Sequence, residues 1–318
     1  MRKGHALRPP ARRGHELKGF SEVARSDLDG HGNAVGIASP YPSGSSFPVR
    51  FDAAKGTFER LYGLNEGVSA VRANDDGLIV TAVGDFWQDG MVWSSGGKPV
   101  CDLSDHDWLV GSIQEMDMHT RPWVYDGTTV KIWGGGSPDV FASAVNSAGR
   151  VVGKQELDAG LAIGSATVGW SVEILPDSVV LLPIDEPSYA ADVSDTGIVV
   201  GGLRSFGLAR AAYVYNLETG DLRVVEPPEG CVAAALHRID PSGSVAVGPG
   251  FCDWRGDVPL VYFVAEDRLV PLEYLTDLSP GWRLVVAQAV NAHGQILAWG
   301  TGGQTGQGET GYFILTPE

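Results

Sequence analysis

Histidine and carboxylate side chains, which bind divalent metals or carry protons in catalysis, gather in one short stretch of the chain. The segment SDHDW (104–108) precedes an apolar run, and QEMDMH (114–119) follows it. His106 is a candidate ligand contact here, and Asp117 and His119 are candidates for acid–base catalysis. Because the spacing matches no named metal motif, a solvated acidic loop is the competing interpretation.

Cysteine chemistry is the next candidate. Cys231 opens one repeat unit and Cys252 lies in a loop of the same unit, so a disulfide and two free thiols both fit. A nucleophilic cysteine needs a base nearby. His237 is the available base, although it lies further along its strand, and we place it with the acid–base candidates.

Two tryptophans are candidate contacts for a ligand. Trp254 and Arg255 stand side by side in a predicted loop, where stacking and charge combine, and simple anchoring of the loop is the alternative. Trp87 belongs to a group of aromatic residues expected on exposed loops. Aromatic side chains in such places are common interface anchors.

These residues are set in a sequence that repeats itself. Six segments combine a short apolar run, a polar turn ending in Gly and a Val-rich run that usually closes on Val-Gly. They are SDLDGHGNAVG (26–36), RANDDGLIVTAVG (72–84), AVNSAGRVVG (144–153), DVSDTGIVVG (192–201), RIDPSGSVAVG (238–248) and AVNAHGQILAWG (289–300). Each predicts a β-hairpin, because Asn, Asp and Ser side chains bond the turn main chain and Gly accepts positive φ.

An aromatic run and a second turn follow each hairpin, as in RPWVYDGTTVKIW (121–133) and AAYVYNLETGDLRVV (211–225). Four strands per unit, at a period of about 45 residues, predict an all-β propeller. One longer gap contains a degenerate unit at 99–135, which brings the count to seven blades. Six blades with a large insertion is the alternative.

The last unit ends after its third strand, at GYFILTPE (311–318). The segment around HELKGF (15–20) is expected to supply the missing outer strand, closing the ring and removing an exposed edge. Residues 15–318 then form one propeller domain, and residues 1–14 form a basic tail that we expect to be disordered.

The fold predicts where a site belongs. Strands A to D of each blade run outward from the central channel, with A–B turns on one rim and the more variable D–A and B–C loops on the other. Variable loops on a rigid scaffold usually carry function, so we predict the binding face on the D–A and B–C rim. Arg72, Asp192 and Arg238 lie on strand A and are candidate ligand contacts at the channel. Salt bridges between adjacent blades, Asp27 with Arg72 and Asp192 with Arg238, are the alternative.

The units AVNSAGRVVG (144–153) and DVSDTGIVVG (192–201) resemble the HAF-type repeat of bacterial proteins, and the resemblance extends over most of the chain. It implies a propeller of a largely uncharacterised extracellular family whose members usually carry a secretion signal. The N-terminal residues here are basic and lack the apolar stretch of such a signal. The sequence as written predicts a cytoplasmic protein, with a secreted one as the alternative if the start is misassigned.

Composition narrows the classes of partner. The formal net charge of −16 repels phosphate backbones and anionic lipid headgroups, so neither nucleic acid nor a membrane is an expected partner. The sequence contains no phosphate loop, HExxH motif, nucleophile elbow or paired CxxC motif, and we expect neither a cofactor nor a metal.

Three functions fit these observations. One is a purely structural or interaction repeat without a small-molecule pocket, which a channel filled by apolar side chains would favour, and the other two involve a site. The first of these two is a propeller that binds a small molecule, a peptide or a protein on the D–A and B–C rim and at the channel mouth. The second is an enzyme, a lyase, cyclase or hydrolase, that uses His and carboxylate groups in a pocket at the same mouth. The enzyme hypothesis predicts at least one His and one carboxylate in a shared concave pocket.

Overall fold

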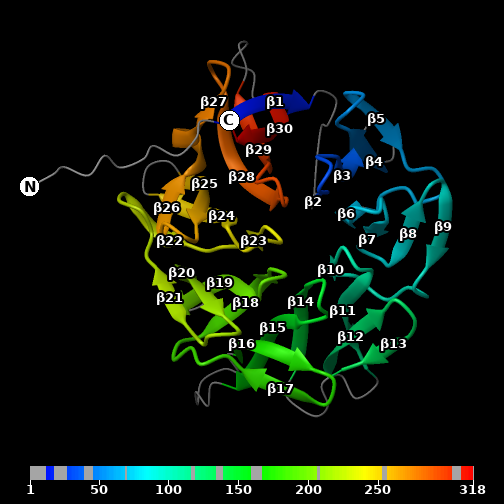
Figure 1. The fold of residues 1–318 in the computed structure, drawn as a ribbon, viewed down its shortest axis with the longest axis vertical. Helices are drawn as coiled ribbons and strands as arrows, with labels where there is room; N and C mark the ends of the chain where they lie inside the picture. The colour runs from blue at the N-terminus through cyan, green and yellow to red at the C-terminus, as the bar shows by residue number, and fades with distance from the viewer. Residues whose placement is uncertain are drawn as a thin grey trace, which may run out of the picture.

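The computed structural model describes residues 12–17, 27–38, 46–68, 70–115, 119–133, 139–158, 167–205, 208–252, 256–302 and 309–317. Within these residues, seven β-sheets stand around a central axis like the blades of a propeller (Figure 1). The prediction of seven blades is confirmed, and the six-bladed alternative is wrong.

The strands of the first four blades follow one another from the axis outward. Blade 1 comprises β2 (Asp27–Leu28), β3 (Ala34–Ala38), β4 (Phe47–Asp52) and β5 (Thr57–Arg60). Blade 2 comprises β6 (Ala70–Ala73), β7 (Ile79–Thr81), β8 (Asp85–Gln88) and β9 (Met91–Ser94). Blade 3 comprises β10 (Asp102–Leu103), β11 (Trp108–Gln114), β12 (Thr120–Asp126) and β13 (Val130–Ile132). Blade 4 comprises β14 (Val140–Val145), β15 (Val151–Asp158), β16 (Thr167–Leu175) and β17 (Ser178–Leu181).

Blade 5 keeps this simple order, and blades 6 and 7 depart from it. Blade 5 comprises β18 (Ser188–Val193), β19 (Ile198–Ser205), β20 (Leu208–Asn216) and β21 (Leu222–Val225). Blade 6 has a divided inner strand and comprises β22 (Cys231–Ala234), β23 (Arg238–Ile239), β24 (Val245–Cys252), β25 (Gly256–Phe263) and β26 (Arg268–Pro271). Blade 7 follows a short 3-10 helix, η1 (Leu272–Leu275), and comprises β28 (Arg283–Val290), β29 (Ile296–Gly302), β30 (Glu309–Pro317), β1 (Arg12–Leu17) and the short β27 (Thr276–Asp277).

One A–B turn recurs in all seven blades. It begins with a buried Asp, Asn or Ser whose side chain accepts main-chain N–H groups of the turn, as Asn146 Oδ1 does from Ala148 at 3.1 Å and Arg150 at 2.9 Å. In six blades the fourth residue of the turn is Gly with positive φ, for example Gly149 at 77°. The residues at the first position are Asp29, Asn74, Ser104, Asn146, Ser194, Asp240 and Asn291.

Blade 3 makes the same turn without glycine. Asp107 takes the glycine position with φ of 60°, and its N–H donates to Ser104 O at 3.2 Å. Asp is among the few non-glycine residues that adopt this conformation with any frequency. This replacement explains why the unit at 99–135 shows no clear hairpin motif in the sequence.

The glycine of the Val-Gly pair has a different role in blades 4 and 5, where it lies in strand B opposite a bulge in strand A. The register between β18 and β19 shifts between Ala190 and Asp192, and a Cβ on Gly201 would stand 2.0 Å from Tyr189 O. The equivalent Gly153 would meet Phe141 O at 1.9 Å. In these two blades only glycine admits the bulged strand at this distance. Gly84 of blade 2 instead follows strand B in a turn, with φ of 85°.

We expect Gly201→Ala to lower the free energy of unfolding by about 1–3 kcal/mol, because the added methyl group forces strand A away from the sheet. Urea unfolding followed by circular dichroism measures the change. The matched control is Gly169→Ala in β16, where a Cβ would have its nearest neighbour at 3.4 Å. Equal stability of the two variants would contradict this explanation of the Val-Gly pair.

The N-terminal strand closes the ring, as predicted. β1 pairs antiparallel with β30 over six residues, from Arg12 opposite Pro317 to Leu17 opposite Tyr312. In Figure 1 this first strand lies beside the C-terminus in blade 7. The strand begins at Arg12, inside the stretch 1–14 that the sequence analysis set apart as a tail. In the part of the chain that the structure describes, no helix has the length and apolar character needed to cross a bilayer.

Adjacent blades pack through apolar side chains. Tyr213 of blade 5 is fully buried beside Ala144 and Val152 of blade 4. Trp87, predicted as an exposed ligand contact, is 5 % exposed and packs between blades 1 and 2 with Val35 and Leu61. That prediction is wrong because the aromatic ring fills the space between two sheets instead of a loop surface.

Candidate functional site

A ring of equivalent strand A positions surrounds the channel. Each member stands opposite an apolar residue of strand B, which is Val in six blades and Leu297 in blade 7. Blade 3 contributes Asp102, which was not predicted from the sequence. The ring consists of Asp27, Arg72, Asp102, Ala144, Asp192, Arg238 and Ala289. Five of its seven residues are ionisable, so the charges of neighbouring blades meet at the axis.

The aspartates of the ring join one blade to the next through the main chain. Asp27 accepts the N–H of Ala73 at 3.2 Å, which links blade 1 to blade 2. Asp192 accepts the N–H of Ile239 at 2.9 Å, which links blade 5 to blade 6. The predicted salt bridges of Asp27 with Arg72 and of Asp192 with Arg238 are not among the ion pairs of the described residues, although the charge of Asp27 does act on Arg72.

Arg72 pairs with the aspartate of the following blade instead. Its Nε donates to Asp102 Oδ1, and Asp102 Oδ2 accepts the N–H of Val145 at 2.9 Å. Burial by itself lowers the pKa of Arg72, but Asp102 and then Asp27 outweigh that effect and raise it. Burial raises the pKa of Asp102, and the charge of Arg72 opposes that rise. The pair therefore ties blades 2, 3 and 4 together at the axis.

The channel end at the A–B turns is acidic. A cavity of about 110 Å³, the A–B mouth, is lined on this side by Asp75, Asp105 and Asp195. These carboxylates bond the neighbouring turn: Asp105 accepts the N–H of Asp75 at 3.3 Å and Asp195 accepts that of Ser147 at 2.8 Å. Burial, and then the charge of Asp75, raise the pKa of Asp105 to about 6. The rim carboxylates thus serve the contacts between blades.

The predicted residues of the stretch 104–119 are separated by the sheet. His106 lies exposed on the A–B rim, where its Nδ1 is 3.1 Å from Ser147 O, so it is on the opposite side from the predicted binding face. His119 lies on the B–C side and pairs with Asp139 at 3.2 Å between Nδ1 and Oδ1. Asp117 lies outside the described residues, as do Trp254 and Arg255.

The channel end at the D–A loops holds a larger cavity of about 490 Å³, which we call the D–A mouth. It lies beyond the ring, between the first residues of the strands A. The polar residues of its lining are Arg72, Cys101, Ser143, Tyr189, His237, Arg238 and Gln288. Unlike the A–B mouth, its described lining contains no carboxylate.

Tyr189 and His237 meet in this cavity. The Tyr189 hydroxyl lies 3.0 Å from His237 Nε2, and the Arg204 guanidinium stands 4.8 Å from the centre of the tyrosine ring. Partial desolvation lowers the pKa of His237, and the charge of Arg204 lowers it further, although the side chain is exposed at the open side of the cavity. Burial raises the pKa of Tyr189. Both groups are therefore neutral at pH 7, and His237 has a phenol where the enzyme hypothesis predicted a carboxylate.

Two buried polar atoms in the same cavity have no hydrogen-bond partner in the described part of the chain. They are Nε of Arg238, a donor, and Oε1 of Gln288, an acceptor. The side-chain amide of Gln288 is also hydrogen-bonded to Tyr312. Arg238 Nη1 donates to His237 O at 3.1 Å, so its guanidinium is only partly satisfied. Unpartnered buried polar atoms are uncommon in native proteins and call for an explanation.

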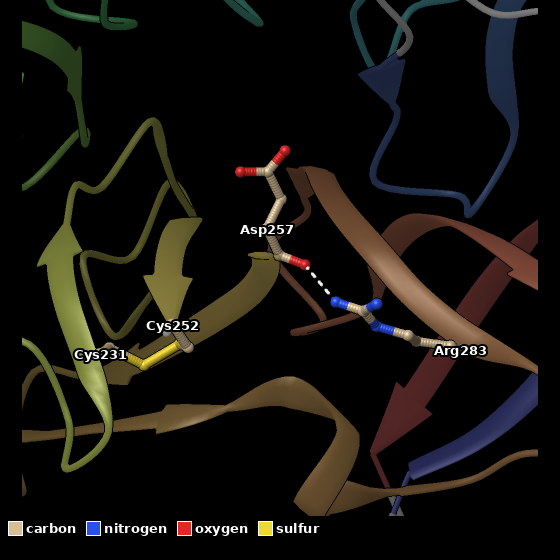
Figure 2. Close-up of a disulfide and its surroundings, with 4 residues drawn as sticks. All are labelled: Cys231, Cys252, Asp257 and Arg283. Atoms are coloured by element: carbon tan, nitrogen blue, oxygen red, sulfur yellow. Dashed lines mark hydrogen bonds between the residues drawn. A yellow bond between two sulfur atoms is a disulfide. The ribbon is translucent and has the colours of Figure 1, made fainter. Parts of the chain in front are cut away.

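The structure joins Cys231 and Cys252 in a disulfide (Figure 2). The two residues face one another across β22 and β24 of blade 6. Figure 2 also shows the neighbouring bond from Arg283 of blade 7 to the main-chain oxygen of Asp257, at 2.9 Å. A cysteine in a disulfide is not a nucleophile, which removes Cys231 and Cys252 from cysteine catalysis.

The described residues contain no group of three or more His, Cys, Asp or Glu side chains placed to hold a metal ion. What the D–A mouth offers is hydrogen bonding, positive charge and one neutral Tyr–His pair. These groups bind and orient a small polar molecule, and the pair is able to exchange a proton with it.

Comparison with known proteins supports the fold. No protein-family model matches the chain, and no curated protein sequence matches it. An oligogalacturonate lyase from Vibrio parahaemolyticus is similar in structure, with a TM-score of 0.57 at 12% identity over 97% of this chain and 91% of that one. The β-propeller domain of the trilobed protease from Pyrococcus furiosus gives a TM-score of 0.56 at 10% identity over 92% and 93%. A chain of the mitotic checkpoint complex gives 0.56 at 11% identity over 100% and 96%. Identities this low show a shared propeller fold and carry no activity over to this chain.

Proposed function

We propose that this propeller binds a small molecule in the D–A mouth. The observation that carries the proposal is the pair of unpartnered buried atoms, Arg238 Nε and Gln288 Oε1, in one cavity. A ligand that accepts a hydrogen bond from the first and donates one to the second satisfies both. The cavity volume of about 490 Å³ is in the usual range for small-molecule sites.

The position of the cavity supports the same proposal. It lies at the D–A end of the channel, on the rim where the connections between blades vary most in length. The charged ring forms its floor, and the bonds among Arg72, Asp102 and Val145 hold that floor in place. A preorganised floor lowers the ordering cost of binding.

We expect compounds that bind in this cavity to lose about tenfold in affinity in Gln288→Leu, because one hydrogen bond is worth about 1–1.5 kcal/mol. A thermal-shift screen of small metabolites with the wild-type protein identifies binders, since a ligand at a hundred times its Kd adds about 2.7 kcal/mol of stability. Titration calorimetry then compares the variants.

Gln155→Leu is the matched control, since Gln155 lies in β15 outside the cavity lining. Binders whose affinity is the same in wild type, Gln288→Leu and Gln155→Leu would place the site elsewhere and contradict the proposal.

A second candidate function, a proton-transfer enzyme in the same cavity, is favoured by the hydrogen bond between Tyr189 and His237. A neutral imidazole bonded to a phenol is able to accept a proton from a bound substrate. For any binder that is converted to a product, His237→Gln is expected to abolish turnover while the thermal shift persists. Unchanged turnover in His237→Gln would exclude this candidate.

A further inference from the structure

We infer that the ligand of the D–A mouth is a small organic anion, held by the guanidinium of Arg238. The inference rests on the proposed function, because it names the chemical class that the same cavity takes. The whole protein has a net charge of −16, so the positive charge at this mouth is a local feature.

The charges at the D–A mouth are unbalanced. Arg238 lines the cavity and Arg204 stands exposed above Tyr189 at its edge. The described residues include no ion pair for either arginine, whereas Arg72 is matched by Asp102. Since the described lining holds no carboxylate, two arginine charges act on whatever enters the cavity.

Asp192 is the acid that sequence position would assign to Arg238, and it is otherwise engaged. Its Oδ1 accepts the N–H of Val193 and its Oδ2 accepts that of Ile239, both at 2.9 Å. Burial raises the pKa of Asp192 well above its usual value, which reduces the negative charge that it offers. Within the described residues the Nε of Arg238 therefore has no acceptor, and a bound ligand would supply one.

The geometry of the guanidinium suits an oxyanion group. Nη1 is used by the main-chain oxygen of His237, and Nε is buried without a partner. A carboxylate, sulfonate or phosphate oxygen accepts strongly from such an N–H, because both partners are charged. A neutral ligand would satisfy the hydrogen bond and leave the charge uncompensated.

The thiol of Cys101, which is not part of the Cys231–Cys252 disulfide, lines the same cavity and reports on its charge. Its rate of labelling is measured with two reagents of similar size, the anionic 2-sulfonatoethyl and the cationic 2-(trimethylammonium)ethyl methanethiosulfonates. Each rate is divided by that of 2-mercaptoethanol with the same reagent. Cys101→Ser gives the background, since Cys231 and Cys252 form a disulfide.

We expect the anionic reagent to be favoured about tenfold at low salt, and the preference to vanish near 1 M salt, where the Debye length is about 3 Å. Arg238→Gln is expected to remove most of the preference, and Arg238→Lys to keep its sign. Arg223→Gln is the control, because Arg223 lies on the outer strand β21 and donates to Val264 O.

The outcomes separate the two proposals. Rapid labelling with no preference, or with a preference for the cationic reagent, would overturn the inference that the ligand is an anion. The proposal of an accessible binding cavity would survive that result. Failure of both reagents to label the folded protein would show that the mouth is closed, and the proposed function would fall with it.

Discussion

Asp102→Ala is expected to lower the free energy of unfolding by about 3–5 kcal/mol, the usual cost of removing one partner from a buried ion pair. Arg72 is only 5 % exposed, so without Asp102 it retains a buried charge that water cannot reach. The N–H of Val145 loses its acceptor at the same time. Urea unfolding followed by circular dichroism measures the difference.

Two variants show whether the effect comes from the ion pair. Asp102→Asn retains an acceptor for Val145 and loses the charge, so it is expected to fall between wild type and Asp102→Ala. Asp257→Ala is the matched control, because the Asp257 side chain is exposed and points away from Arg283 in Figure 2. If Asp102→Ala were as stable as Asp257→Ala, the axis would not depend on this pair.

Loss of the disulfide is expected to cost about 3 kcal/mol of stability, from the entropy of the unfolded chain that a bridge over 21 residues removes. The double variant Cys231→Ala/Cys252→Ala is compared with wild type, each with and without a phosphine reductant. Wild type should lose stability on reduction, and the double variant should not respond.

Cys101→Ser is the control, since Cys101 is not part of the Cys231–Cys252 disulfide. It should respond to the reductant as wild type does, and a wild type indifferent to reduction would count against a stabilising bridge. Because disulfides persist mainly in oxidising compartments, the pairing favours the secreted alternative over the cytoplasmic one, and the location of the protein stays a prediction.

The sequence predicted the architecture because the information that specifies a blade is local. Each turn needs an Asx or Ser side chain and a positive φ a few residues later, and these leave a motif that recurs at each unit. Blade 3 shows the limit of that argument. With Asp107 at the position of the glycine, its hairpin was not recognised, and Asp102 was therefore missing from the predicted ring.

The partners of the channel residues could not be predicted in the same way. The repeat placed Arg72, Asp192 and Arg238 at equivalent positions, but whether a side chain turns to the preceding or the following blade depends on packing between sheets. Tyr189 was missed, although it stands two residues before Ala191 and so points to the same side of strand A. Alternation counted from Asp192, the predicted residue of this strand, does not reach Tyr189, because the bulge between Ala190 and Asp192 interrupts it.

The pairing of β1 with β30 has a consequence for biosynthesis. The edge of β1 that pairs with β30 stays unpaired during synthesis until β30 has been translated, roughly 300 residues later. The propeller ring therefore closes only after β30 has been synthesised. A contact of such long sequence separation is expected to form slowly. A nascent chain stalled before β30 would expose two sheet edges, which makes premature termination a route to aggregation.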